Sequence, residues 1–102
     1  MKSQWTFLSN HAHVLVCIAR NPDTRVRDIA DQVGITERAV QRIISELEEA
    51  GFVSHERNGR RNHYKIDPDR GLRHEPESGV SIRALLSSVV PDVSLGDDEA
   101  NS

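Results

Sequence analysis

Three side chains suited to molecular recognition lie close together in the segment RDIADQVGITERAVQRIISEL, residues 27–47. Arg38, Gln41 and Arg42 fall on one side of the helix that this segment predicts, opposite its apolar residues. Guanidinium and carboxamide groups can form paired hydrogen bonds with base edges, arginine with guanine and glutamine with adenine. Exposed arginine and glutamine also occur on helix faces that contact only water, so the surrounding elements must decide between the two interpretations.

A basic hairpin is expected to follow that segment. The stretches FVSHER and RRNHYKI flank Asn58-Gly59, which is a strong signal for a type I′ turn because both central residues need positive φ. The cross-strand pairs that this turn predicts are Arg57–Arg60, Glu56–Arg61 and Val53–Tyr64. The basic residues of the hairpin are Arg57, Arg60, Arg61 and Lys65, against Glu56 as its acidic residue. This excess of positive charge favours contact with phosphate groups.

Helices must position both segments, and the first of them is expected near the amino end. Ser9 or Thr6 is a suitable cap, and apolar residues then recur at helical spacing as far as about Arg20. Residues 21–23, Asn-Pro-Asp, end this helix because proline cannot continue the hydrogen-bond ladder.

The next two helices have the spacing of a helix-turn-helix. One covers about residues 27–33, and the other covers residues 37–50 with Thr36 as its N-cap. Helices that cross at a tight turn need a small residue at the contact, a residue tolerant of positive φ, and a buried aliphatic residue. Ala30, Gly34 and Val40 meet these demands at intervals of four and six residues.

Residues 9–66 resemble the winged helix-turn-helix domains of bacterial and archaeal transcription regulators, particularly the MarR-like and ArsR-like groups. The segment that carries the resemblance is TRVRDIADQVGITERAVQRIISELEEAGFVSHERNGRRNHYKID. The resemblance implies a mainly α fold with a small β-hairpin (α+β), in which a three-helix core carries a wing and a C-terminal helix. It also implies double-stranded DNA as a partner, with helix 37–50 in the major groove and the wing, residues 52–66, on the adjacent backbone or minor groove.

The resemblance and the chemistry of the side chains together predict a set of DNA contacts. Thr36 and the amino end of its helix can hold a phosphate group, and Arg25 and Arg27 can grip the flanking backbone. Glu37 is interpreted as a partner of the helix dipole rather than as a base reader, and His63 as either a DNA contact or a solvated side chain. The predicted DNA-binding residues are Arg25, Arg27, Thr36, Glu37, Arg38, Gln41, Arg42, Arg57, Asn58, Arg60, Arg61, His63 and Lys65.

Apolar residues also occur at both ends of the chain, outside the three-helix core. Family members dimerise through terminal helices, so a homodimer on a palindromic operator is expected, with Ser81 capping a helix at 82–90. The interface residues predicted in this way are Trp5, Phe7, Leu8, Ile82, Leu85, Leu86 and Val89. The alternative is that helix 82–90 packs on the first helix of its own chain. The expected domains are residues 1–67 for DNA binding, 68–90 as connection and amphipathic helix for dimerisation or packing, and 91–102 as an acidic disordered tail.

The distribution of charge modifies what the net charge suggests. The formal charge of −3 argues against a nucleic-acid partner, whose electrostatic footprint is usually basic. Residues 1–66, however, hold 10 basic and 8 acidic side chains, a net of +2, and residues 67–102 hold 3 and 8, a net of −5. A weakly basic domain is therefore followed by an acidic segment, and shape and base contacts must supply much of the binding.

Several other classes are disfavoured. One cysteine, Cys17, allows no intramolecular disulfide, and the sequence has no signal peptide and no long apolar run, so a cytoplasmic protein outside the membrane is expected. A phosphate loop, a nucleophile–base pair and a carboxylate pair in a pocket are all missing, so neither an enzyme nor a cofactor is predicted. His13 and Cys17 supply two ligands at helical spacing where a metal site needs three or four.

Two other functions fit parts of the pattern. A winged helix can serve as a protein-interaction module, although such a module has no need of four cationic side chains in its wing. An architectural DNA-binding protein would share the same residues. A small-molecule effector is doubtful, because full-length MarR-like proteins have longer dimerisation helices around their ligand site.

Overall fold

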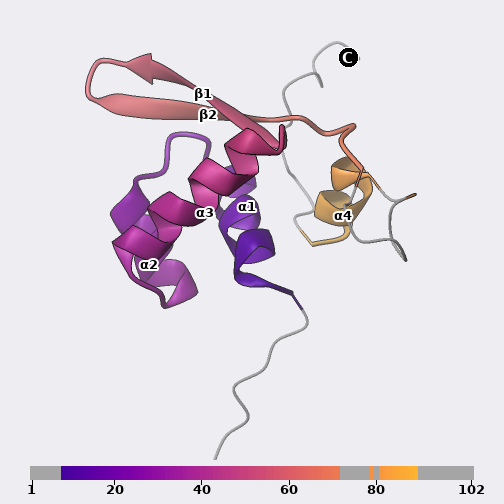
Figure 1. Ribbon diagram of the computed structural model, residues 1–102, viewed down its shortest axis with the longest axis horizontal. Helices are drawn as coiled ribbons and strands as arrows, with labels where there is room; N and C mark the ends of the chain where they lie inside the picture. Colours follow the sequence, from indigo (N-terminus) through magenta and orange to yellow (C-terminus); the bar gives the residue numbers. More distant parts are fainter. Residues whose placement is uncertain (1–7, 72–78, 80, 90–102) are drawn as a thin grey trace, which may run out of the picture.

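The computed structural model describes residues 8–71, 79 and 81–89. Its elements are α1 (Asn10–Arg20), α2 (Val26–Val33), α3 (Glu37–Glu49), β1 (Val53–Asn58), β2 (Arg61–Ile66) and α4 (Ile82–Val89). Figure 1 shows α1, α2 and α3 packed beneath the β1–β2 hairpin, with α4 beyond the base of the hairpin. The predicted α+β fold is confirmed. Trp5, Phe7 and the tail 91–102 lie outside the described residues.

Side-chain caps define where the helices begin. The Ser9 hydroxyl accepts a hydrogen bond from the Ala12 N–H at 3.2 Å, so Ser9 rather than Thr6 caps α1. The Thr36 hydroxyl accepts from Ala39 at 3.0 Å, and the Ser81 hydroxyl accepts from Ala84 at 3.2 Å. Each hydroxyl satisfies a backbone donor that the first turn leaves unpaired, which explains why these helices begin where the sequence predicts.

The turn between α2 and α3 has the geometry that the spacing predicts. Gly34 adopts φ +86°, and its N–H donates to the Ala30 carbonyl at 2.8 Å. The Ile35 N–H donates to the same carbonyl at 3.2 Å, which completes the end of α2. Ala30 and Val40 are buried where the two helices meet. The helix-turn-helix therefore depends on a left-handed residue at position 34.

The core joins all the elements. Apolar side chains of α1, α2 and α3 pack against the base of the hairpin and against α4. The most deeply buried side chains are Val14, Ile18, Ile29, Val40, Ile43 and Leu86. Cys17 belongs to this core, as expected of a small apolar side chain, and burial raises the pKa of its thiol.

The register of the hairpin differs from the predicted one. Val53 pairs with Ile66 and Asn58 pairs with Arg61, which shifts every predicted pair by two residues and places Gly59 and Arg60 in the turn. Gly59 has φ +69° and Arg60 does not have positive φ, which fits a type II′ turn and not the predicted type I′. The same side chains still face inward because the strand period is two. The observed register also sets two apolar residues, Val53 and Ile66, opposite each other at the base.

Two of the predicted interface residues prove to be core residues of their own chain. Ile82 and Leu86 are 2% and 0% exposed and pack with α1, which is the alternative considered above. Backbone hydrogen bonds from Ile82 to the Arg70 carbonyl and from Arg83 to the Pro68 carbonyl fasten α4 to the chain that follows β2. Ile82 and Leu86 are therefore not available to a partner, whereas Val89 is 41% exposed.

The role of Gly34 gives a direct test of the fold. A Cβ at Gly34 or at Gly79 would meet no atom within 4 Å, but of these two glycines only Gly34 has positive φ. We therefore expect Gly34→Ala to lower the free energy of unfolding by about 1 kcal/mol, because an L side chain is strained in that conformation. Gly79→Ala is the matched control and should leave the stability unchanged or slightly higher. Urea unfolding measures both, and equal stabilities would contradict the argument.

Candidate nucleic-acid interface

The helix α3 separates its apolar and polar residues onto two sides. Val40, Ile43 and Leu47 are buried against the other elements, while Arg38 and Gln41 are exposed on the other side. Neither the Arg38 side chain nor the Gln41 side chain forms a hydrogen bond or ion pair with another described residue. These two side chains are therefore available to an external partner. The predicted side of the recognition helix is the exposed one.

Arg42, the third predicted base reader, is engaged within the protein. Its Nε lies 3.9 Å from Glu46 Oε2, one helical turn away. The other Glu46 oxygen is 2.7 Å from His11 Nε2 on α1. This hydrogen bond lowers the pKa of the Glu46 carboxyl, and the charges of His11 and Arg42 act in the same direction. Arg42 thus belongs to a short polar network that links α3 to α1.

The basic residues of the wing are not equivalent. Lys65 Nζ lies 3.2 Å from Glu56 on the neighbouring strand, and Arg57 Nε donates to the Gly59 carbonyl at 3.2 Å. Arg60 stands in the turn, is exposed, and has no hydrogen bond or ion pair within the described part of the chain. The available charge of the wing is therefore concentrated at its tip.

Two further wing residues contact the loop between α1 and α2. His63 Nδ1 lies 2.7 Å from Asp23 Oδ1, and Arg61 Nη1 donates to the Asp23 carbonyl at 3.4 Å. His63 was expected either to contact DNA or to be solvated. In the structure its ring instead lies on a carboxylate of the same chain. The wing and the helix-turn-helix meet at this loop.

The remaining predicted contact residues lie on exposed positions around α2 and α3. Arg25 and Arg27 stand at the amino end of α2, and Thr36 and Glu37 at the amino end of α3. Glu37 lies in the first turn of α3, where a carboxylate complements the helix dipole. Asn58 ends β1 and is also exposed.

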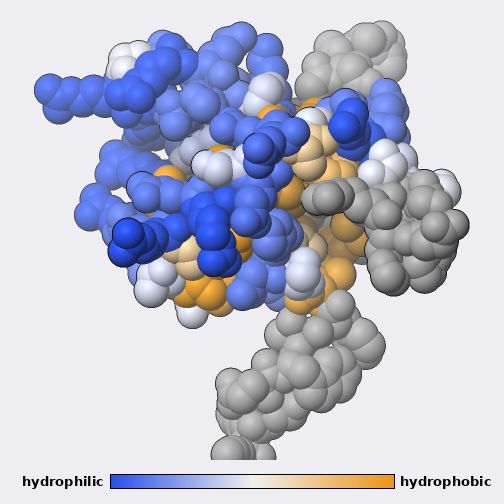
Figure 2. All heavy atoms as spheres, in the orientation of Figure 1, coloured by the Kyte–Doolittle hydropathy of each residue, from blue (hydrophilic) through white to orange (hydrophobic). Residues whose placement is uncertain are grey.

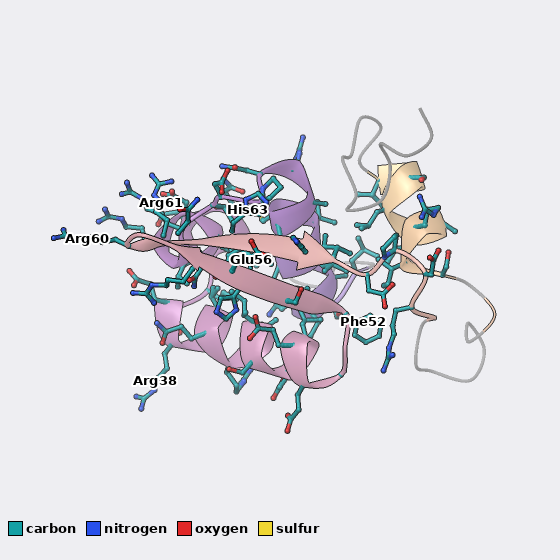
Figure 3. The ribbon with its side chains drawn as sticks, turned by 90° about the horizontal axis from the view of Figure 1, so that it is seen from above. Arg38, Phe52, Glu56, Arg60, Arg61 and His63 are labelled. Carbon is teal, nitrogen blue, oxygen red and sulfur yellow. The ribbon has the colours of Figure 1, made fainter. Side chains whose placement is uncertain are left out.

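Figure 3 shows how the labelled side chains are arranged. Arg38 on α3 and Arg60 and Arg61 at the wing tip project from the same end of the molecule, whereas Phe52 and α4 lie at the opposite end. Figure 2 shows hydrophilic residues over the wing and apolar surface towards α4. Arg38, Arg60 and Arg61 therefore share one end of the molecule.

Sequence reasoning did not identify the acidic and histidine residues that hold this surface together. In the sequence Asp23 is visible only as part of the Asn-Pro-Asp segment that ends the first helix, and no motif includes Glu48. Glu48 accepts a hydrogen bond from His55 Nδ1 on β1. Asp23 and His63 are 40 positions apart in the sequence, and His11 and Glu46 are 35 apart. Local patterns carry no signal for such pairs.

Other kinds of site find little support among the described residues. A groove of about 870 Å³ between α1 and α2 is lined by residues that include His13, Cys17 and Gln32, and the Cys17 thiol donates to Gln32 Oε1 at 3.2 Å. Within the described ranges, no three His, Cys, Asp or Glu side chains are grouped to hold a metal ion. In the same ranges no helix has the length and apolar character needed to cross a membrane.

Residues 10–54 match a family model described as "Winged helix-turn-helix DNA-binding". The matched segment runs from α1 through α3 into β1, the part of the chain that contains Gly34 and the exposed side of α3. This segment is therefore similar to the winged helix-turn-helix DNA-binding family, and the described residues have the winged helix-turn-helix fold. The family model ends at residue 54, within β1, so the assignment of the wing rests on the hairpin and its position over the helices.

A solved structure has the same winged helix-turn-helix fold. It is the crystal structure of the PcaV transcriptional regulator from Streptomyces coelicolor in complex with its natural ligand. The two chains are 24% identical and superpose with a TM-score of 0.54, over 92% of this chain and 67% of PcaV. No curated protein matches the sequence.

The network around Glu46 predicts a pH-dependent contribution to stability. Because its carboxyl has a lowered pKa in the folded chain, unfolding takes up protons, so its contribution exists at neutral pH and is lost as the pH falls through the folded-state pKa. We expect Glu46→Gln to reduce the free energy of unfolding at about pH 7, with the difference from wild type shrinking as the pH is lowered into the acid range. Urea unfolding at neutral and at acid pH measures this difference.

The control for that measurement is Glu49→Gln on the same helix. Glu49 is exposed, and its side chain forms no hydrogen bond or ion pair with another described residue. Its substitution should cause no loss of stability at neutral pH. A Glu46→Gln deficit that persists at low pH would show that packing, rather than the charge of the carboxylate, is responsible.

Proposed function

We propose that the chain is a sequence-specific transcriptional regulator that inserts α3 into the major groove and lays its wing against the neighbouring backbone or minor groove. The observation that carries the proposal is the set of unpartnered polar side chains Arg38, Gln41 and Arg60. They are exposed on α3 and at the wing tip, and Arg38 and Arg60 project from the same end of the molecule. The match to a DNA-binding family supports the same conclusion.

The proposed contacts have two roles, which are base readout and positioning of the protein on the DNA backbone. Arg38 and Gln41 can pair with guanine and adenine edges because nothing in the described chain engages them. Arg42 is held near Glu46 and is better suited to a phosphate contact at the side of the groove. Arg25 and Arg27 at the amino end of α2 can add contacts to the flanking backbone, and Arg60 can enter a narrow minor groove.

The charge distribution supports specific rather than tight non-specific binding. Residues 1–66 carry a net charge of +2, and intramolecular carboxylates engage Lys65 and His63. Few phosphate groups can then be neutralised by unpaired cations, so base contacts must supply a larger share of the affinity.

Selection from random duplex DNA, followed by affinity measurements at several salt concentrations, tests this proposal. We expect a defined sequence to emerge, with an affinity that falls as salt increases because bound phosphates release counterions. Gln41→Ala should cost about 1–3 kcal/mol on the selected site and relax the preference at one base pair. Arg60→Ala should weaken binding to every sequence and reduce the salt dependence.

Glu49→Gln provides the matched control here, because it changes a charge at the far end of α3 from Arg38. It should leave the sequence preference unaltered. Binding that is undetectable or independent of salt would reject DNA as the partner. A Gln41→Ala variant that lost affinity equally for all sequences would reject the assignment of base readout.

A homodimer on a palindromic site completes the proposal. One α3 reads only a half-site, and a two-fold pair places two such helices about one turn of DNA apart. Ile82 and Leu86 are occupied in the core of the chain. Among the described residues of α4, Val89 has an exposed apolar side chain, and we assign it the contact with a partner copy.

Val89→Glu is therefore expected to shift the chain from dimer to monomer in sedimentation experiments, because an apolar contact would be replaced by a charge. Affinity for a palindromic duplex should fall by about tenfold or more, whereas affinity for a single half-site should change little. Ser87→Glu, at another exposed position of α4, is the control and should remain a dimer. A wild-type monomer that selects a single half-site would disprove dimerisation.

A further inference from the structure

The wing is buried only at its base. Val53 is the only buried residue of β1, and in β2 burial is confined to Tyr64 and Ile66. From His55 to Asn62 the hairpin has no buried side chain. A two-stranded hairpin is marginally stable by itself, so polar attachments must determine where the outer half of the wing lies.

On β1 the polar attachment is the hydrogen bond from His55 to Glu48 on α3, and the attachments of β2 converge on two residues of the α1–α2 loop. The Tyr64 N–H donates to the Pro22 carbonyl at 2.9 Å, so the loop lies along the edge of β2. Next along the strand, His63 Nδ1 meets Asp23 Oδ1 at 2.7 Å and Arg61 Nη1 donates to the Asp23 carbonyl at 3.4 Å. Asp23 thus contacts the outer half of the wing through both its side chain and its backbone.

Asp23 is itself held in place relative to the helices. Its N–H donates to Asn21 Oδ1 at 3.1 Å, and the Thr24 N–H donates to the Asn21 carbonyl at 3.0 Å. Thr24 is buried, at 8% exposure, and the Asn21 N–H donates to the Cys17 carbonyl at the end of α1. The loop is therefore a fixed point on the helical core, and a wing attached to it is held relative to α3.

We propose that Asp23 is a positioning residue that sets the orientation of the wing relative to α3, and that protonation of His63 tightens this attachment and increases the affinity for DNA. The part of the proposal that concerns affinity rests on the DNA-binding function proposed above. Asp23 acts through His63 and Arg61 and is not assigned a DNA contact of its own.

The charges around His63 give the effect its direction. Asp23 faces the ring from the loop, Glu56 is its cross-strand partner on β1, and Lys65 and Arg61 stand on either side along β2. When the His63 ring is neutral, the charges of these two acidic and two basic groups sum to zero. Protonation gives this cluster a positive charge, which attracts phosphate, and turns the contact with Asp23 into a stronger, charge-assisted hydrogen bond. Both effects favour DNA binding at lower pH.

Affinity for the selected duplex at about pH 6 and about pH 8 tests the link to protonation. We expect the wild-type chain to bind about two- to fivefold more tightly at the lower pH, the range appropriate to an exposed ion pair. His63→Gln and Asp23→Asn should both reduce that ratio, since the first variant cannot be protonated and the second offers no charge. His13→Gln, in the α1–α2 groove, is the control and should keep the wild-type ratio. An undiminished ratio in His63→Gln would overturn this part of the proposal.

Orientation of the wing is measured without DNA, by residual dipolar couplings of the backbone amides. Asp23→Ala should change the orientation of residues 55–62 relative to α3, whereas Asp23→Asn keeps an acceptor oxygen for His63 and should preserve it at about pH 8. Asp31→Ala, an exposed acidic position on α2, is the control. An unchanged wing in Asp23→Ala would overturn the positioning role. If the wild-type chain bound no duplex at any pH, the proposed DNA-binding function would be rejected. The dipolar couplings, which are measured without DNA, would still decide whether Asp23 positions the wing.

Discussion

Burial of one side of α3 is the interaction on which the rest of the structure depends. Val40 and Ile43 are almost completely inaccessible, and Ile44 and Leu47 are buried beside them. Transfer of such side chains from water is the main favourable contribution to folding, and it fixes the rotation of the helix about its axis. The rotation in turn exposes Arg38 and Gln41, so the same packing that stabilises the core also creates the exposed polar side of α3.

Polar contacts between distant parts of the chain complete what the apolar core begins. Histidine–carboxylate pairs join α1 to α3 through His11 and Glu46, β1 to α3 through His55, and β2 to the α1–α2 loop through His63. All three contacts are exposed or half-buried, where an ion pair contributes little to overall stability. Their effect is on geometry, because each holds one structural element at a set position relative to another.

Local rules predicted the elements well and the contacts between them less well. The caps at Ser9 and Thr36 and the left-handed Gly34 depend on neighbouring residues and were located correctly, and a hairpin does form around Gly59, although its turn lies one residue later than predicted. The register failed because a shift of two residues leaves the inward and outward residues of each strand unchanged, so alternation cannot distinguish the two. The sequence also could not predict whether Ile82 and Leu86 pack on their own chain or on a partner, since an amphipathic helix buries its apolar side equally well in either way.

The sequence by itself determined which residues form helices and strands, and which side of α3 is polar, because periodicity, capping and turn conformations are properties of short segments. Only the tertiary structure decided which of those polar side chains remain available. Arg42 and Arg60 look alike in sequence, yet Glu46 engages one and nothing in the described chain engages the other. That difference arises from residues brought together by folding, and Asp23 acquires its importance for the wing in the same way.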